Sequence, residues 1–160
     1  MFNAVIDTLT EYLENQTVLS EFTIFDNVFM PLFEGNSQLV FQEGFINRFP
    51  AMCFDFTINR ERMNVGFKRI YQGRLVVAVM ALDMGQGLVD AGRDLDRYID
   101  DTGYILDILF ATPTPVISGT NIHLRQFEIG AVQQGNFKQK EDGENFFISK
   151  FIPLSFHIIY

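Results

Sequence analysis

The sequence has no tryptophan, one cysteine and two histidines among its 160 residues. A single cysteine excludes a disulfide framework within the chain. Cys53 lies in the apolar run 51–54, which predicts a buried thiol rather than a reactive one. No second histidine or cysteine lies near His123 or His157 in the sequence to complete a tetrahedral metal site. We therefore expect no metal and no cofactor.

Basic residues are missing from the first part of the chain, where no lysine or arginine precedes Arg48. The opening segment carries Asp7, Glu11 and Glu14 instead, which is the opposite of the basic start of a signal peptide. The longest uncharged apolar run covers residues 75–82, and roughly 20 such residues are needed to cross a bilayer. We expect neither a secretory signal nor a transmembrane segment.

Positive charge is scarce overall, because 20 acidic residues face 12 basic ones and the net charge is −8. Such a chain is repelled by nucleic-acid phosphates and by anionic membrane surfaces, so we expect it neither to wrap DNA nor to bind a membrane. Hydrophobic residues make up 48% of the chain and include 18 Phe. This length and composition predict one folded domain, residues 1–160, with Phe to spare for subunit contacts.

Helical spacing marks two parts of the sequence. Apolar residues in the first segment recur every three or four positions, which predicts an amphipathic helix of about four turns. The same spacing returns over residues 88–110, where Gly103 is a point at which the helix kinks or divides. The prolines in 112–115 end this second helix.

Strand-forming residues occupy much of the rest. Residues 51–58 and 65–71 predict a hairpin or meander around a polar segment, with a turn at Gln72-Gly73. Residues 74–83 form a nearly continuous apolar run, typical of a central strand covered on both faces. Residues 120–160 predict two long strands around a turn at Asp142-Gly143, and Pro153 predicts an edge strand or a bulge.

These elements predict an α+β fold: a single domain with a mixed, mostly antiparallel sheet, two helices packed on one face and a long C-terminal β-hairpin. The stretch 20–44 is interrupted by Pro31 and Gly35, which indicates an extended arm or an irregular strand pair. Within it, residues 22–44 are a candidate inserted arm.

Catalytic patterns are scarce, so we expect no enzymatic activity. The sequence has no nucleophile elbow. Gly85-Gln86-Gly87 follows a strand and opens a helix, but a tight turn explains these glycines better than a phosphate loop does. A small hydrolase or nuclease is the less favoured alternative, with Asp55 and Asp83 as its carboxylates.

Two charged segments are candidate subunit or partner interfaces. Five of the twelve basic residues lie within fifteen positions, and such a strand-loop-strand suits docking onto an acidic partner, although an ordinary charged hairpin is the alternative. These residues are Arg60, Arg62, Lys68, Arg69 and Arg74. The second segment is the turn with Lys138, Lys140, Glu141, Asp142 and Glu144.

A third charged segment is the acidic series of the second helix. Its aspartates lie three or four residues from Arg93 or Arg97, which indicates a solvated helix face with internal ion pairs. An electrostatic contact surface is the alternative. The series is Asp90, Asp94, Asp96, Asp100 and Asp101.

In order and spacing, the chain resembles the tail terminator (tail completion, head-tail joining) family of tailed bacteriophages. The likeness lies in the segments NAVIDTLTEYL, FPAMCFDF, GRLVVAVMALD, GLVDAGRDLDRYIDD and FFISKFIPLSFHII. The resemblance implies a structural virion protein, assembled in the host cytoplasm. In that family a hexameric ring caps the tail tube, ends its polymerisation and joins the tail to the head connector.

The resemblance also implies the partners of the chain. These are further copies of itself, the tail tube protein and the head connector or neck proteins, while DNA passes through the channel without specific binding. The alternative is another phage structural component, from the neck, the tail tube or the baseplate.

Overall fold

A computed structural model describes residues 2–25, 49–62, 67–81, 83, 85–111, 116–117, 119–139 and 146–159. Its helices are α1 (Phe2–Glu14), the short 3₁₀ helix η1 (Thr17–Leu19), α4 (Gln86–Asp100) and α5 (Ile105–Ala111). Its strands are β1 (Thr23–Phe25), β2 (Ala51–Arg62), β3 (Phe67–Ala81), β4 (Arg125–Ile129), β5 (Gln133–Gln139) and β6 (Phe146–Ile159). No described helix has the length and apolar character needed to cross a membrane.

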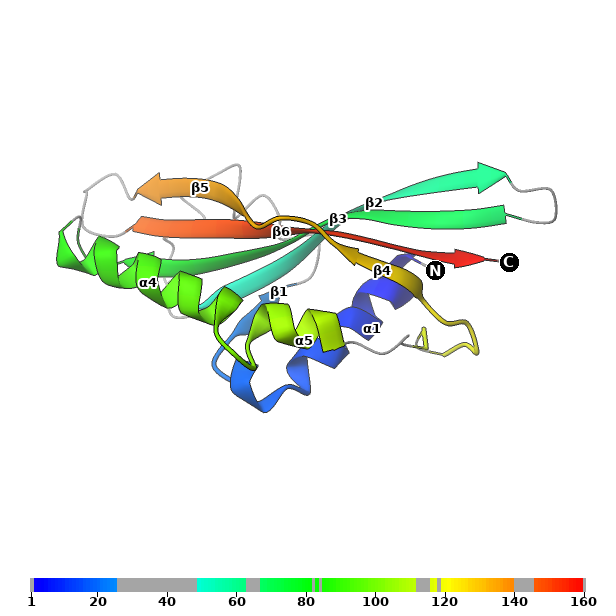
Figure 1. The fold of residues 1–160 in the computed structure, drawn as a ribbon, viewed down its shortest axis with the longest axis horizontal. Coiled ribbons are helices and arrows are strands. Elements are labelled where there is room, and N and C mark those ends of the chain that lie inside the picture. The colour runs from blue at the N-terminus through cyan, green and yellow to red at the C-terminus, as the bar shows by residue number, and fades with distance from the viewer. Residues whose placement is uncertain are drawn as a thin grey trace.

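One sheet runs through the molecule, and α1, α4 and α5 lie on the same side of it (Figure 1). β3 is central and pairs antiparallel with β2 on one side and with β6 on the other. β1 pairs parallel with β2, while β4 and β5 pair in turn with successive parts of β6. The sheet is therefore mixed and mostly antiparallel, which confirms the predicted α+β fold with its C-terminal strand pair.

The main core lies between the sheet and the helices. Because side chains alternate along a strand, every second residue of β3 faces the helices, as Leu75, Val77 and Val79 do. The apolar stripe of α1, including Leu9 and Leu13, packs into the same core. The predicted placement of the helices on one face of the sheet is confirmed.

The opposite face of the sheet carries a smaller buried cluster. Val76 and Ala78 of β3 lie there with Cys53 of β2 and Phe147 of β6. β3 is thus covered on both faces, as its continuous apolar run predicts. Cys53 is fully buried, which confirms the expectation of an unexposed thiol.

The predicted turn at Gln72-Gly73 is wrong, because β3 continues through both residues. Gly73 pairs with Phe56, and a Cβ built on it would lie 1.8 Å from the backbone oxygen of Asp55. The glycine therefore permits a close approach of two strands. The local sequence around a glycine does not distinguish a glycine within a strand from a glycine in a turn.

The second predicted helix is divided, as expected, near Gly103. α4 ends at Asp100 and α5 begins at Ile105, while Gly103 has a φ of 83°, a conformation that glycine adopts at little cost. The backbone N–H of Gly103 donates to Oδ2 of Asp107 at 2.7 Å. This bond ties the linker to the first turn of α5.

The C-terminal region has one strand more than predicted, since the first long strand is split into β4 and β5. Pro153 does not lie on an edge strand, because β6 lies between β3 and the β4–β5 pair. It lies instead where β4 has ended and β5 has not begun, and its carbonyl accepts the N–H of Gly130 at 2.8 Å. That interruption tolerates a residue with no N–H of its own.

The candidate inserted arm begins inside the sheet, because Thr23, Ile24 and Phe25 pair with β2. Residues 26–44 of this arm lie outside the described residues.

Candidate interaction surfaces

The first predicted interface segment forms the far end of the β2–β3 hairpin, at the right in Figure 1. The register pairs Arg60 with Arg69 and Glu61 with Lys68. Lys68 and Arg69 are partly exposed, while only the backbone positions of Arg60 and Arg62 are described. Two arginine positions are therefore directly opposite each other in the ladder, an arrangement in which like charges repel.

Arg74 lies apart from the end of the hairpin and has partners within the chain. Its Nε lies 3.1 Å from Oδ2 of Asp55, and its guanidinium carbon lies 4.8 Å from the ring centroid of Phe151. Burial lowers the pKa of Arg74 and raises the pKa of Asp55. Arg74 is therefore a neutralised residue of the sheet face, five positions along β3 from Arg69.

The backbone of Arg125 lies near the same end of the sheet, although nothing in the sequence indicates this. It pairs with His157 of β6, which pairs with Ile70 of β3. β4 is three strands away from β2, or about 14 Å at the usual strand spacing. We use the name basic end for the positions Arg60, Arg62, Lys68, Arg69 and Arg125, which the register divides between the two faces of the sheet.

The second predicted interface segment is only partly described. Lys138 lies on β5, where its backbone pairs with Phe147, while Lys140, Glu141, Asp142 and Glu144 lie outside the described residues. The ladder between β3 and β6 runs from Lys68↔Ile159 to Ala81↔Phe146. Lys68 and the β5 position of Lys138 thus lie toward opposite ends of one sheet, roughly 40 Å apart at the usual rise per residue.

The acidic series of α4 is exposed and contains ion pairs, as the sequence predicts. Asp94 accepts a salt bridge from Arg97 at 3.3 Å. Lys150 of β6 pairs with Asp96, and Nε2 of Gln86 donates to Oδ1 of Asp90 at 2.9 Å. Part of the negative charge on this helix is therefore balanced within the chain.

The outer face of α1 differs from α4, because the helix carries no basic residue. Asp7, Glu11 and Glu14 are exposed at spacings of four and three residues. Among the described residues, no ion pair joins any of them to a basic side chain. We call these three carboxylates the α1 stripe.

The carboxylates of the hydrolase alternative do not meet in one site. Oδ1 of Asp83 accepts the backbone N–H groups of Gly85 and Gly87, each at 2.9 Å. Asp55 pairs instead with Arg74. Arg74 precedes Asp83 by nine positions, and nine residues of an extended strand span roughly 30 Å. Asp83 also places a carboxylate at the start of α4, where a phosphate loop would hold its anion.

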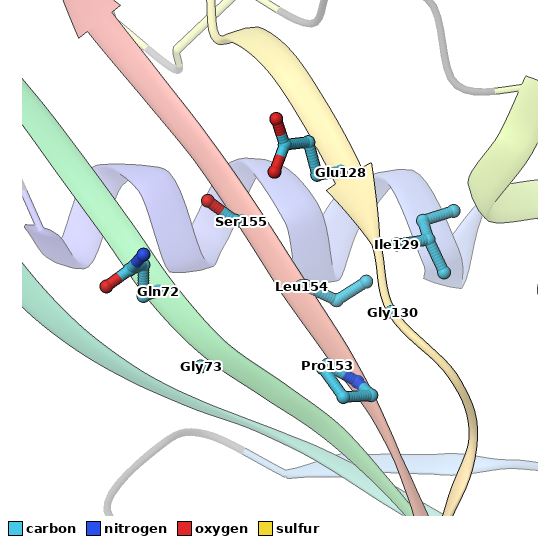
Figure 2. Close-up of a pocket in the computed structure, with 8 residues that line it drawn as sticks. All are labelled: Gln72, Gly73, Glu128, Ile129, Gly130, Pro153, Leu154 and Ser155. Carbon is cyan, nitrogen blue, oxygen red and sulfur yellow. The ribbon is translucent and has the colours of Figure 1, made fainter.

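A hollow of about 330 Å³ lies where β4 gives way to β5 (Figure 2). Gln72 and Ser155 occupy strand positions on the face of the sheet opposite the main core, and both line the hollow. Glu128 of β4 pairs with Ser155. The lining holds one carboxylate and no histidine, lysine or arginine, so it offers no cation for a phosphate. The lining residues are Gln72, Gly73, Glu128, Ile129, Gly130, Pro153, Leu154 and Ser155.

Within the described ranges, no three His, Cys, Asp or Glu side chains are placed to hold a metal ion. His123 is exposed, whereas His157 is buried in β6. The basic end and the α1 stripe are groups of residues with opposite charge. The sequence matches no family model and no curated protein.

Proposed function

We propose that this chain is a structural virion protein that forms a ring at the end of a phage tail tube. The ring ends the growth of the tube and joins the tail to the head connector. One observation carries the proposal: the sheet is long, with Lys68 and Arg69 at one end of the β3–β6 ladder and the β5 position of Lys138 toward the other.

A ring needs two different complementary patches on each subunit, because a head-to-tail contact repeats until the rotation closes. A subunit with unlike ends meets this requirement. A symmetric dimer would instead use one self-complementary patch. The geometry of this sheet therefore favours ring or tube assembly over simple pairing.

The net charge of −8 supports a channel that lets DNA slide. Phosphates are repelled by acidic walls, so DNA passes without adhering. For this the basic end must face a protein neighbour and not the channel. The proposal therefore includes six copies per ring, acidic or neutral channel walls, and assembly in the host cytoplasm.

Electron microscopy of the assembled particle tests this proposal. We expect six copies on the tail axis between the tube and the head connector. Purified protein added to growing tail tubes should bind their ends and limit tube length. A monomer away from the axis, or a channel lined by the basic end gripping DNA, would contradict the proposal.

The alternative is another neck, tail tube or baseplate component, because the same sheet ends suit any such assembly. The position of the chain in the particle separates these roles. A repeated density along the tube would identify a tube protein, and density at the distal end would identify a baseplate protein.

A further inference from the structure

The hollow beside β4 gathers polar side chains from three neighbouring strands. Gln72 of β3 pairs with Ser155 of β6, and Ser155 pairs with Glu128 of β4. Residues directly opposite each other in a ladder lie on the same face of a sheet. An amide, a hydroxyl and a carboxylate therefore form one row across the strands (Figure 2), about 10 Å long at the usual strand spacing.

The rest of the lining is backbone and one apolar ring. Ile129 and Leu154 belong to the main core side of the sheet, so their backbone forms part of the floor of the hollow. Pro153 supplies an apolar wall. A Cβ on Gly130 would lie 2.9 Å from Cβ of Pro153, so the glycine keeps this wall uncrowded.

The charge of the hollow suits a cationic group. Glu128, Gln72 and Ser155 each offer an acceptor oxygen, and no basic side chain belongs to the lining. Glu128 is exposed, and the salt bridges among the described residues do not include it. The net charge of −8 also favours the approach of cations to this protein.

Of the two basic side chains, arginine matches this row better. A guanidinium is planar and binds a carboxylate through two parallel N–H groups, which leaves further N–H donors for neighbouring acceptors. A lysine ammonium is a compact point charge with three donors. The methylene stem of arginine can also pack on an apolar surface such as the Pro153 ring.

We propose that the hollow binds the side chain of an arginine that another protein presents. Glu128 accepts the guanidinium through its two oxygens, while Ser155 and Gln72 accept remaining N–H groups. The hollow measures about 330 Å³, which leaves room for the stem as well as the guanidinium. The inference does not depend on the proposed ring, because the lining residues lie outside the basic end and the α1 stripe.

Titration of the full chain with arginine capped at both ends, N-acetyl-arginine methylamide, tests the site. In ¹H–¹⁵N NMR spectra we expect the amide signals of Gln72, Glu128, Gly130 and Ser155 to shift, with a dissociation constant in the millimolar range. The capped lysine should bind several-fold more weakly. The capped citrulline, which is similar in shape but uncharged, should not bind, and added salt should weaken the binding of arginine.

Three variants provide the second arm, each at an exposed side chain whose replacement should leave the fold intact. Glu128→Gln should weaken the binding of capped arginine about tenfold or more, because it removes the charge from the acceptor. Gln72→Lys should abolish binding, because its ammonium competes for Glu128. Glu11→Gln is the matched control: it removes one negative charge from α1, on the other side of the sheet, and should leave binding unchanged.

Several results would overturn the inference. They include equal binding of capped citrulline, full affinity in Glu128→Gln, and no shift at all, as expected if Glu128 is already paired within its own chain. Tighter binding of free arginine than of capped arginine would indicate a small-molecule site instead of a protein contact. Shifts of the same amides when the protein alone is concentrated would assign the hollow to a second copy.

Discussion

At the scale of single residues, Gly73 shows how closely two strands can approach. Any side chain there would overlap the backbone oxygen of Asp55. We expect Gly73→Ala to lower the free energy of unfolding by about 3 kcal/mol or more, because the strands must separate or shift. Chemical denaturation of the purified protein measures this change.

Gly92 is the matched control for that substitution. It lies in α4, and a Cβ there would meet nothing within 4 Å. Gly92→Ala should raise stability by about 0.5–1 kcal/mol, because alanine loses less backbone entropy in a helix. Equal effects at the two glycines would contradict the close approach at Gly73.

Tyr98 gives the protein a stability change at high pH. Burial raises the pKa of Tyr98 to about 12, assisted by the hydrogen bond with Glu21 and its negative charge. The folded protein therefore holds the phenol proton more tightly than the unfolded chain, whose tyrosine pKa is about 10. This stabilisation is fully present below pH 10 and is lost as the pH rises through about 12.

Thermal unfolding between about pH 10 and 12 should show this loss as a fall in the melting temperature. Tyr98→Phe should remove the contribution of Tyr98 to that fall. Glu21→Gln should make this loss smaller and complete it at a lower pH, because the negative charge that opposes ionisation in the folded protein is gone. An unchanged pH profile in Tyr98→Phe would mean that other groups govern alkaline unfolding.

At the scale of elements, α1 separates a core face from an outer face. Leu9 is 2% exposed and packs in the main core, while Glu11 is exposed on the α1 stripe. We expect Leu9→Ala to cost about 2–4 kcal/mol of unfolding free energy, because it leaves a cavity. Glu11→Ala should change stability by no more than about 0.5 kcal/mol.

Denaturation curves for the two variants test this division of α1. The Glu11→Ala variant should keep its fold and its stability. If Leu9→Ala kept full stability but lost assembly, the apolar face of α1 would be an interface and not part of the core.

At the scale of the whole molecule, the proposed ring depends on charge. Reversal of Arg60, Arg62 and Lys68 to glutamate should weaken assembly while the fold stays intact, since exposed charges contribute little to stability. The assembly of the unmodified chain should weaken as salt is added. Sedimentation at several ionic strengths measures both effects, and normal assembly of the triple variant in dilute salt would show that the basic end is merely solvated.

The sequence by itself determined the elements whose signal is local. α1 and the division near Gly103 follow from helical spacing and one glycine, and the central strand follows from the apolar run that contains Leu75. Such patterns are visible without a partner because a helix repeats every 3.6 residues and a strand every two. The acidic α4 face was predictable for the same reason.

Only the tertiary structure decided features that depend on residues far apart in the chain. It continued β3 through Gly73, placed Pro153 at a break between neighbouring strands, paired Arg74 with Asp55 and brought Arg125 to the basic end. Each of these depends on strand register, which long-range pairing sets. Register decides which charges stand together and which are neutralised, so the candidate interface could be only partly read from the order of the residues.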